Sequence, residues 1–583
     1  MKSIFYLMAL SGFLILTLYG CGDSSSPLER TYGVGGKTYC EETAAVFKSA
    51  LDLHITRSQS DADALYSKTL SDMLSEINSI ATQNRAMSSE KYNEDYNQLK
   101  TELANAPATQ LSDCADLVKI QDFANRNSVS YRGQVQGSKT DDPINPVQPA
   151  VFHAFLSNFA QNLDPFSHYF YGQGGANRLT YNFGVSVDAN SHNIYGDSQT
   201  EVEVFATDDE ADNPLKIHDR ILSVSDPLTE PTDTPSILTS VGTLLNDTAQ
   251  ELVANFGVIN FEQIFSNSPT PYLSVKVKRA GTEKEEIVSL SRRASEKPPL
   301  VSTEVIDDHI IWARLKQFDV GLAPELTTKL NATLASIKSK ASSEKSANEN
   351  SKTGIILDLR FNPGGSVMEI HSLVNLFLDK GTVGTMKSKT GGQMKEEPFT
   401  LLEHAKFKDQ PLIILINHRS ASASDISTQF LQETGRAFVV GETSFGKGIG
   451  QASISLNGIS HLGGVLYVTT IQFYGPSGKS IQAVGNEPNH PVVDPKIERM
   501  RNACLAKNQC RFLRMADYAK NGRDIPPTGS PVAPITPLTN VTKTEVTAAQ
   551  INGAQNAINA LPKVPDDIVL ENAKQIMKQL IHS

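Results

Sequence analysis

The stretch Gly354-Ile-Ile-Leu-Asp-Leu-Arg360 is the part of this sequence that says most about the fold. Pro411-Leu-Ile-Ile-Leu-Ile-Asn417 is a second apolar run of the same kind. Strands that are apolar at nearly every position are typical of the interior of an α/β sheet, where helices cover both faces. Val367 to Leu378, between the two runs, has the apolar spacing of a helix. We therefore predict an α/β core over residues 300–500, with a polar, low-complexity insert at residues 337–352.

The region before this core has a helical texture. Apolar residues recur every three to four positions between residues 40 and 130, and Asp164-Pro165 ends a later helical pattern. The predicted helices are Glu41–Leu53, Ala62–Thr82, Ser89–Leu103 and Val151–Leu163. A polar, Pro/Gly-punctuated linker is expected at residues 128–149. We predict a helical N-terminal region over residues 40–175.

Residues 178–293 change to short alternating runs, which predict a small β domain with one or two helices. The expected strands are Phe183–Val187, Glu201–Phe205, Asp219–Val224, Tyr272–Lys278 and Glu286–Leu290, and the expected helix is Ile237–Ala254. Residues 501–583 read as a C-terminal extension with a Pro/Thr-rich connector and two helical patterns. The predicted fold class is therefore multidomain α/β (α+β).

The composition is that of a globular protein with several domains. At about 150 residues per domain, 583 residues predict three to four domains. The net charge is −11, from 53 basic and 64 acidic residues. A nucleic-acid-binding face would need clustered Lys and Arg, so we expect no nucleic-acid partner.

The N-terminus resembles a bacterial lipoprotein signal. Met1-Lys2-Ser3 is basic, Ile4 to Leu18 is apolar, and Cys21 follows with a polar stretch behind it. This predicts a signal peptide at residues 1–20, a tether at 21–39 and a lipid on Cys21. The expected location is the periplasmic face of the cell envelope, with the outer membrane favoured because Gly22 follows Cys21. The alternative is an ordinary secretory signal with an incidental cysteine.

In an oxidising compartment, the four further cysteines could form disulfides. Cys40, Cys114, Cys504 and Cys510 allow three pairings into two disulfides. Sequence proximity favours Cys504–Cys510 and leaves Cys40–Cys114, while free buried thiols are the alternative. The sequence has no C-x-x-C pair and no H-E-x-x-H motif, so we expect no metal and no cofactor.

Three motifs between residues 354 and 451 contain groups that could take part in catalysis. Asn362-Pro363-Gly364-Gly365 follows a strand and can expose backbone N–H groups to an oxyanion, or is a plain turn. Ser420-Ala-Ser-Ala-Ser-Asp425 lies where a strand meets a helix, so its serines can be nucleophiles or merely N-caps, with Ser424 or Asp425 the better caps. Lys447, in Phe445-Gly-Lys-Gly448, can accept a proton if it is buried and neutral; the alternative is a solvated surface lysine.

Together these motifs resemble the C-terminal processing peptidases, or tail-specific proteases. The matching segments are Leu357-Asp-Leu-Arg-Phe-Asn-Pro-Gly-Gly365, Ser420-Ala-Ser-Ala-Ser-Asp425, Gly435-Arg-Ala-Phe-Val-Val-Gly-Glu442, Phe445-Gly-Lys-Gly448 and Gly475-Pro-Ser-Gly-Lys-Ser-Ile-Gln482. The resemblance is strong over residues 302–493 and fair over 150–293. It implies a crotonase/ClpP-like peptidase core.

The resemblance also implies roles for individual residues. Ser422 would be the nucleophile, Lys447 the general base, and Gln451 the residue that orients the lysine. Backbone N–H groups of Ala423 and of Gly364 or Gly365 would form the oxyanion hole. The family uses neither a metal nor a catalytic histidine, and His418 matches no role in it.

The β region resembles the PDZ domain of these peptidases. Phe183, Gly184 and Val185 stand where the family has its carboxylate-binding loop. PDZ domains bind an extended C-terminus by strand addition. His218 replaces the glycine that the family has in Leu215-Lys-Ile-His-Asp-Arg-Ile221, so the fold is better supported than peptide binding.

The leading hypothesis is a lipid-anchored serine endopeptidase with a Ser422–Lys447 dyad. Its partners would be exported proteins or peptides with accessible C-termini, selected or gated by the PDZ domain, together with a possible adaptor or oligomer. The alternative is a catalytically silent or partner-activated binding protein of the same fold. An α/β hydrolase would need G-x-S-x-G, which Ser422 lacks.

Overall fold

The computed structural model describes most of the chain. The described residues are 39–83, 90–127, 147, 149–170, 183–188, 202–207, 213–225, 265, 272–291, 298–343, 352–390, 392–456, 464–495, 497–499, 502, 514–520, 526–527, 529–563 and 565–582. The signal segment with Cys21, the helix expected at Ile237–Ala254, and Cys504 and Cys510 lie outside the described residues.

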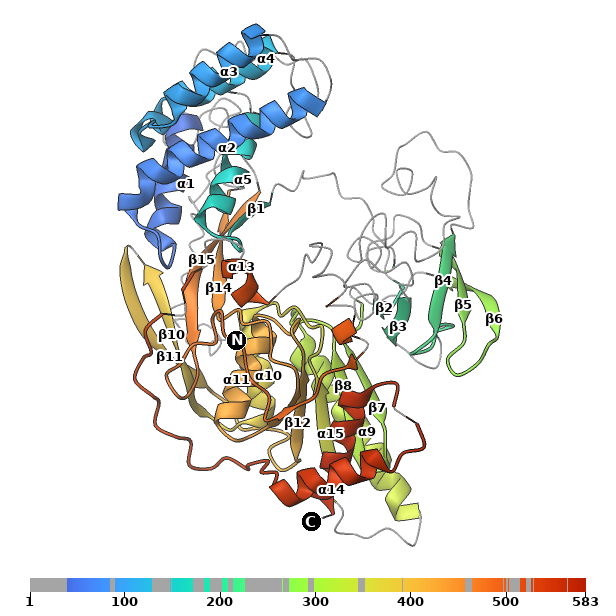
Figure 1. Cartoon of the computed structure of the whole chain (residues 1–583). Helices are drawn as coiled ribbons and strands as arrows, with labels where there is room; N and C mark the ends of the chain where they lie inside the picture. Colours follow the sequence, from blue (N-terminus) through green and yellow to red (C-terminus); the bar gives the residue numbers. More distant parts are fainter. Residues whose placement is uncertain are drawn as a thin grey trace, which may run out of the picture.

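Helices pack together in the N-terminal helical region, at the top of Figure 1. They are α1 (Tyr39–Leu53), α2 (Ala62–Gln83), α3 (Glu90–Leu103), α4 (Ala115–Arg126) and α5 (Pro149–Leu163). Their apolar faces share one core, in which Phe47 lies 4.5 Å from Phe159 and 6.3 Å from Tyr66, centroid to centroid. A disulfide joins Cys40 to Cys114, the pairing that the sequence favoured for these two residues. The predicted helices of this region are confirmed.

A small antiparallel sheet with its own apolar core lies to one side of the molecule (Figure 1). Its strands are ordered β2 (Val185–Asp188), β3 (Val202–Thr207), β4 (Arg220–Ser225), β5 (Tyr272–Lys278) and β6 (Glu285–Ser291). All the strands predicted here are present, with bounds that differ by at most two residues. That this sheet is a PDZ domain stays a prediction.

A six-stranded sheet forms the centre of the core. Its order is β16 (His490–Pro491), β13 (Phe438–Gly441), β12 (Leu412–Ile416), β9 (Gly354–Asp358), β8 (Ile310–Leu315) and β7 (Val301–Val305). Neighbouring strands run parallel, except that β7 is antiparallel to β8. Every residue of β9 and β12 is buried, which confirms the two interior strands predicted from their apolar runs.

Helices cover both faces of this sheet. On one face lie α9 (Leu322–Ser343), α10 (Val367–Phe377) and α11 (Ala423–Glu433), and on the other α14 (Ala548–Asn559) and α15 (Ile568–Ile581). Ile355 and Leu357 of β9 pack in the first layer and Ile356 in the second, so both faces of the strand must be apolar.

The predicted polar insert at residues 337–352 needs a correction. Helix α9 continues through Ser343, so the first part of that segment is helical. Its Lys and Ala residues are good helix formers and Ile337 is buried, so the polar composition did not end the helix.

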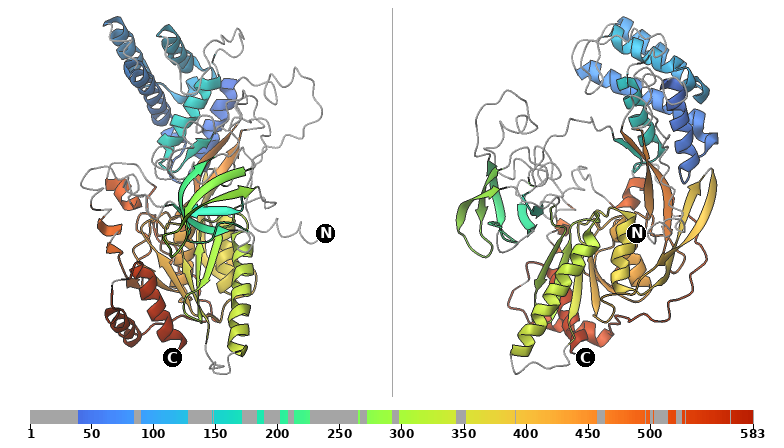
Figure 2. Two further views of the ribbon diagram at one scale, coloured as in Figure 1. Left: turned by 90° about the vertical axis from the view of Figure 1, so that its right-hand side faces the viewer. Right: turned by 180° about the vertical axis from the view of Figure 1, so that it is seen from behind.

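A second antiparallel sheet joins the helical region to the core and was not predicted. It is ordered β1 (His168–Phe170), β15 (Val465–Tyr474), β10 (Gly381–Thr390) and β11 (Gln393–Leu401), with β14 (Ile449–Ser455) also paired to β15. Ile454, Leu456, Leu466 and Val468 at one end of β14 and β15 are buried in the core of the helical region, and Figure 2 shows this junction from two sides. Within the predicted helical region 40–175, the described residues after α5 include a short strand, β1, that was not predicted.

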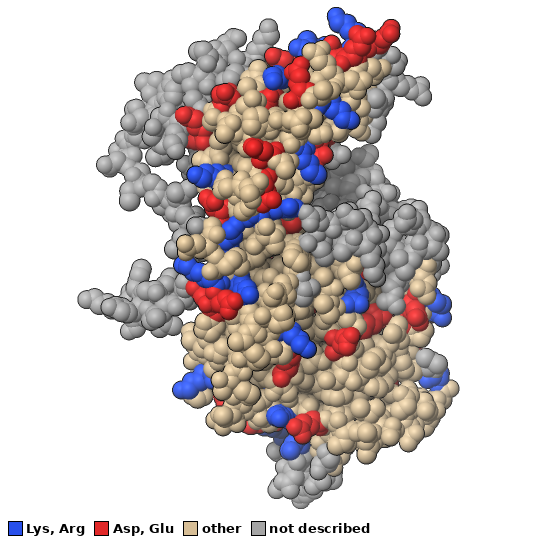
Figure 3. Space-filling model, turned by 60° about the vertical axis from the view of Figure 1, so that its left-hand side comes forward, with Lys and Arg blue, Asp and Glu red and all other residues tan. Residues whose placement is uncertain are grey.

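The C-terminal extension wraps around the core and ends in α14 and α15, as the two predicted helical patterns indicate. Arg360 forms ion pairs with Asp358 (2.6 Å) and with Asp567 (2.8 Å), the residue that caps α15. Within the described ranges, no helix combines the length and apolarity needed to cross a membrane. On the face shown in Figure 3, basic and acidic side chains are interspersed.

Candidate active site

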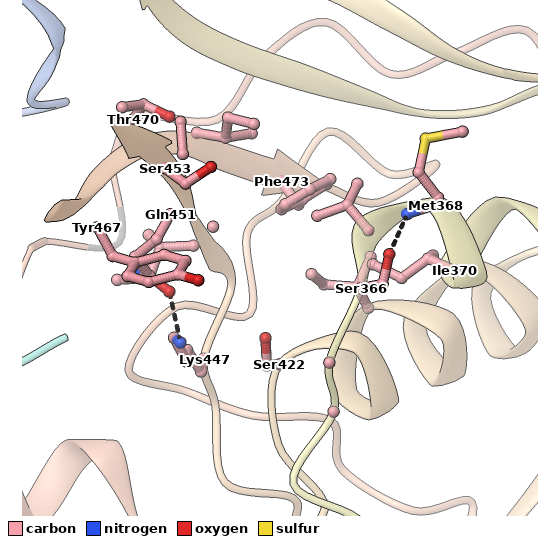
Figure 4. A pocket seen from close by; sticks show the side chains of 18 of the residues that line it. Ser366, Met368, Ile370, Ser422, Lys447, Gln451, Ser453, Tyr467, Thr470 and Phe473 are labelled. Carbon is pink, nitrogen blue, oxygen red and sulfur yellow. Dashed lines mark hydrogen bonds between the residues drawn. The ribbon is translucent and has the colours of Figure 1, made fainter. Parts of the chain in front are cut away.

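Ser422 stands at the corner where the chain leaves β12 and enters α11. Its backbone has φ 56° and ψ −114°, a strained conformation for a residue with a side chain. Such strain persists only where the surroundings hold it: Ser422 N–H donates to Asp425 Oδ2 (2.8 Å), and its carbonyl accepts from Ile426 N–H (2.9 Å). The turn directs the Ser422 hydroxyl into a cleft (Figure 4).

Asp425 ties the serine turn to the lysine loop. Its buried carboxylate accepts hydrogen bonds from Ser422 N–H, from Gly446 N–H (3.1 Å) and from Lys447 N–H (2.9 Å). Burial raises the pKa of Asp425 to about 6, although hydrogen bonds from Ser444 and these N–H groups oppose the shift. One carboxylate thus fixes the backbone on both sides of the cleft. From the sequence, Asp425 was expected only as a possible N-cap of the helix.

Lys447 is held by neighbouring side chains. Its Nζ donates to Gln451 Oε1 (2.8 Å) and lies 5.1 Å from the centre of the Phe166 ring. Gln451 Nε2 donates in turn to Thr469 Oγ1 (3.0 Å), which fixes the orientation of the amide. Burial lowers the pKa of Lys447 to about 8, against the opposing charges of Asp164 and Asp425. A large fraction of this lysine is therefore neutral near pH 8.

The glycine pair of Asn362-Pro363-Gly364-Gly365 passes directly against the serine turn. A Cβ on Gly364 would come within 2.5 Å of Ala421 O and 2.8 Å of Ser422 Cβ, so only glycine fits there. Gly364 N–H already donates to Asn362 Oδ1 (2.9 Å). Among the described residues, none accepts a hydrogen bond from Gly365 N–H or Ala423 N–H. Of the two expected glycine donors, the open one is Gly365.

A cleft of about 770 Å³ contains Ser422, Lys447 and Gln451 (Figure 4). Apolar side chains from α10, α11 and the second sheet line it: Val367, Ile370, Met386, Ile426, Ile471 and Phe473. Leu53 and His168 of the helical region also line the cleft. An extended peptide with apolar side chains could therefore bind across Ser422.

The structure brings together only part of the predicted site. Phe183 and Val185 are buried in the small sheet, and the loop they form with Gly184 does not line the cleft. His418 bonds Glu442 Oε2 through Nδ1 (2.7 Å) and is likewise absent from the cleft lining. In the described part of the chain, no group of three or more His, Cys, Asp or Glu residues could hold a metal ion.

The sequence analysis missed three side chains behind the lysine: His54, Asp164 and Thr469. His54 Nε2 lies 2.7 Å from Asp164 Oδ2, and Thr469 holds Gln451. Asp164 had been noted for ending a helix with Pro165 and as part of Leu163-Asp-Pro-Phe-Ser-His-Tyr169, a stretch that resembles the segment before the PDZ domain in the C-terminal processing peptidases, but not for any contact with the lysine. No local signal could have shown that residues from such distant segments meet.

Comparisons with known proteins find a similarity to a described family over the part of the chain that holds Ser422, Lys447 and Gln451. Residues 315–492, which include Ser422, Lys447 and Gln451, match the model of peptidase family S41. A carboxy-terminal-processing protease of Bartonella bacilliformis is 34% identical over 196 residues, covering 34% of this chain and 42% of that protein. A carboxyl-terminal-processing protease of Synechocystis sp. is 30% identical over 230 residues, covering 39% of this chain and 48% of that protein.

The match thus spans less than half the length of each of these two relatives. Among solved structures, a photosystem II D1 C-terminal processing protease aligns at 16% identity with a TM-score of 0.33, covering 76% of this chain and 97% of that chain.

Proposed function

We propose that this chain is a serine endopeptidase that cleaves exported proteins at or near their C-termini, and the match of residues 315–492 to the model of peptidase family S41 supports this proposal. The observation that carries the proposal is that Ser422 and the half-buried Lys447, whose pKa is lowered, line the same apolar cleft. A neutral amine beside a serine hydroxyl is what a Ser-Lys dyad requires.

The mechanism follows from the positions of these groups. Ser422 Oγ attacks the substrate carbonyl carbon while Lys447 Nζ accepts the hydroxyl proton. Ala423 N–H and Gly365 N–H stabilise the oxyanion, aided by the N-terminus of α11. When the C–N bond breaks, Lys447 gives its proton to the leaving amine. Water, deprotonated by Lys447, then attacks the acyl-enzyme and releases both the carboxyl product and Ser422.

The small sheet is proposed to select substrates. β2, which follows the loop Phe183-Gly184-Val185, is an edge strand of that sheet, and an edge strand can accept an added peptide strand. A lipid on Cys21 would hold the enzyme at the periplasmic face of the membrane, near such substrates.

A partner-activated or silent protein is the second candidate. The observation in its favour is that, within the described residues, no hydrogen bond joins Ser422 Oγ to Lys447 Nζ. Catalytic hydrogen bonds are often long before substrate binds, so a dyad that closes only on its substrate would also lack this bond here.

The test is proteolysis of fluorescently labelled casein by residues 22–583, beside Ser422→Ala and Lys447→Ala variants. We expect cleavage by the wild type and none by either variant. No cleavage by folded wild type, even with added peptides that carry free or amidated C-termini, would reject the enzyme. Cleavage that appears only with the free C-terminus would support gating.

A further inference from the structure

We propose that Asp164, held by His54, is a positioning residue for Lys447, and that the N-terminal helical region thereby completes the active site. The inference rests on the proposed function, because it concerns the same lysine. Its basis is a chain of hydrogen-bonded polar groups that runs from the ends of α1 and α5 to Lys447 Nζ, and its members are buried as far as Thr469.

Asp164 is fully committed to local hydrogen bonds. Its Oδ1 accepts from Phe166 N–H (2.6 Å) and Ser167 N–H (2.9 Å), and its Oδ2 accepts from Ser167 Oγ–H (2.7 Å) and His54 Nε2 (2.7 Å). The residue is 2% exposed. A buried carboxylate with this set of donors is stable in its charged form. It also fixes the turn that follows α5.

His54 has one tautomer that fits its surroundings. Its Nδ1 accepts hydrogen bonds from Thr56 N–H (3.2 Å) and Arg57 N–H (3.0 Å), so that nitrogen carries a lone pair. The hydrogen is then on Nε2, where it is donated to Asp164. His54 comes from the end of α1, so the contact locks α1 to the turn after α5.

The turn that Asp164 fixes reaches the lysine by two routes. Through Ser167, whose Oγ accepts from Thr469 N–H (3.1 Å), it positions Thr469, which holds Gln451 and therefore Lys447 Nζ. Through Phe166, it places a ring face 5.1 Å from Lys447 Nζ. Both routes need the helical region to be docked on β15, where Ile55 N–H also donates to Thr469 O (2.8 Å).

Charged groups surround this chain from several elements. Asp164 and Asp425 act on Lys447 and raise its pKa against the larger effect of burial. Near the end of α1, Lys389 of β10 donates to Leu51 O and Arg57 O, and Arg57 Nε donates to Leu163 O (3.4 Å). Burial favours the neutral form of Asp164, but the hydrogen bonds from His54, Ser167 and Phe166 outweigh it and hold the pKa of Asp164 below its usual value.

The charge of Asp164 gives the proposal a direction that can be measured. Asp164→Asn removes one negative charge near Lys447, so the lysine should lose its proton at lower pH. We expect a downward shift of about one pH unit from the wild-type midpoint. Undocking of the helical region would instead expose Lys447 to water and move its midpoint up from about 8 towards 10.5. The two explanations thus differ in sign.

The experiment measures Lys447 without turnover. Residues 22–583 are treated with trace acetic anhydride across pH 6 to 11 (roughly the range that brackets lysine titration), and acetylation of Lys447 is quantified by mass spectrometry. The matched control is Asp116→Asn, which changes a buried aspartate of the same helical region that contacts Tyr66 and Lys119. The control should leave the Lys447 midpoint unchanged.

Thr469 separates positioning from charge. Thr469→Val keeps the shape but removes the oxygen that accepts from Gln451 Nε2. We expect kcat to fall about tenfold, the equivalent of one net hydrogen bond, with no downward shift of the acid limb of kcat/KM. Thr469→Ser retains the hydroxyl and should retain most of kcat.

Each outcome decides something. A lower midpoint in Asp164→Asn, with an unchanged Asp116→Asn control, supports the proposal. A midpoint that stays in place or rises overturns it, and so does a Thr469→Val variant with wild-type kcat. If the protein cleaves nothing but the midpoint still falls, the proposed function fails while the coupling of Asp164 to Lys447 stands.

Discussion

The helical region and the small sheet flank the same core, yet they are attached to it differently. The helical region shares one apolar cluster with β14 and β15 and sends a buried hydrogen-bonded chain to Lys447. The small sheet keeps a separate apolar core. It reaches the core largely through polar contacts, such as His218 Nε2 to Glu304 Oε1 (2.8 Å) and Arg314 Nη2 to Phe205 O (3.3 Å).

This difference indicates which of the two regions is fixed to the core that contains the cleft. A shared apolar core resists separation, because moving the parts apart would expose buried surface to water. A polar contact can exchange its partner for water at little net cost. We therefore expect the helical region to stay fixed on the second sheet, and the small sheet to be the part that can move when a substrate binds.

The largest effect is expected where the chain from the helical region ends. Lys447→Ala removes the proposed base, and turnover of labelled casein should fall by about 10⁴-fold or more. The free energy of unfolding should not fall, because a buried cation is lost and no ion pair is broken. Stopped assays beside urea unfolding curves measure both. A variant that keeps a tenth of wild-type activity would remove Lys447 from the mechanism.

The pH profile should show the two groups that the cleft buries. Lys447 is neutral above its pKa of about 8, so log kcat/KM should fall by one per pH unit below that value. Asp425 is ionised above its pKa of about 6, and its protonation weakens the acceptor for Ser422 N–H and Lys447 N–H. The slope should therefore steepen to about two below pH 6. A slope of one down to pH 5 would contradict this role for Asp425.

The disulfide tests the coupling of the helical region to catalysis. Cys40 and Cys114 close a loop with a sequence separation of 74, and changing both to Ser should lower stability by about 4 kcal/mol. Casein turnover should fall at the temperature where the helical region unfolds, since His54 and Asp164 lose their places together. Circular dichroism and activity followed on one temperature ramp give the comparison. Activity that survives melting of the helices would break the claimed coupling.

The smallest effect is expected at the small sheet. Hydrogen bonds to Glu203 and Glu304 raise the pKa of His218 to about 9. This contact should stabilise the interface fully below pH 6.5 and be lost as pH rises through about 9. His218→Ala should speed hydrogen exchange in β3 and β4 and leave the acid limb of kcat/KM in place. A shifted acid limb would show that the small sheet, too, acts on Lys447.

The two interior strands could be predicted because the sequence pattern that produces them lies in consecutive residues. Ile355 to Leu357 are apolar since helices cover both faces, and that pattern is written in consecutive residues. The second sheet could not be predicted in the same way. Lys387, Lys395 and Glu396 make β10 and β11 read as polar surface, although these strands pair over their whole length.

The residues of the candidate site also fall into two groups, those in a local sequence motif and those brought together by long-range packing. Ser422, Lys447 and Gln451 stand in short motifs, so a resemblance of motifs could point to them. His54 and Asp164, which are 110 positions apart in the sequence, come together only because α1, α5 and β15 meet. Such contacts depend on which distant segments pack together, and a local sequence pattern does not reveal this. Gly364 shows a finer limit, since only the structure reveals that its N–H is taken by Asn362.

Covalent labelling tests the central claim most directly. Residues 22–583 and the Lys447→Ala variant are incubated at pH 8.5 (about half a unit above the lysine pKa) with a fluorophosphonate probe, and the modified peptide is identified by mass spectrometry. The account predicts a label on Ser422 in the wild type and almost none in the variant. Labelling of a different serine, or equal labelling of Ser422 in both proteins, would contradict it.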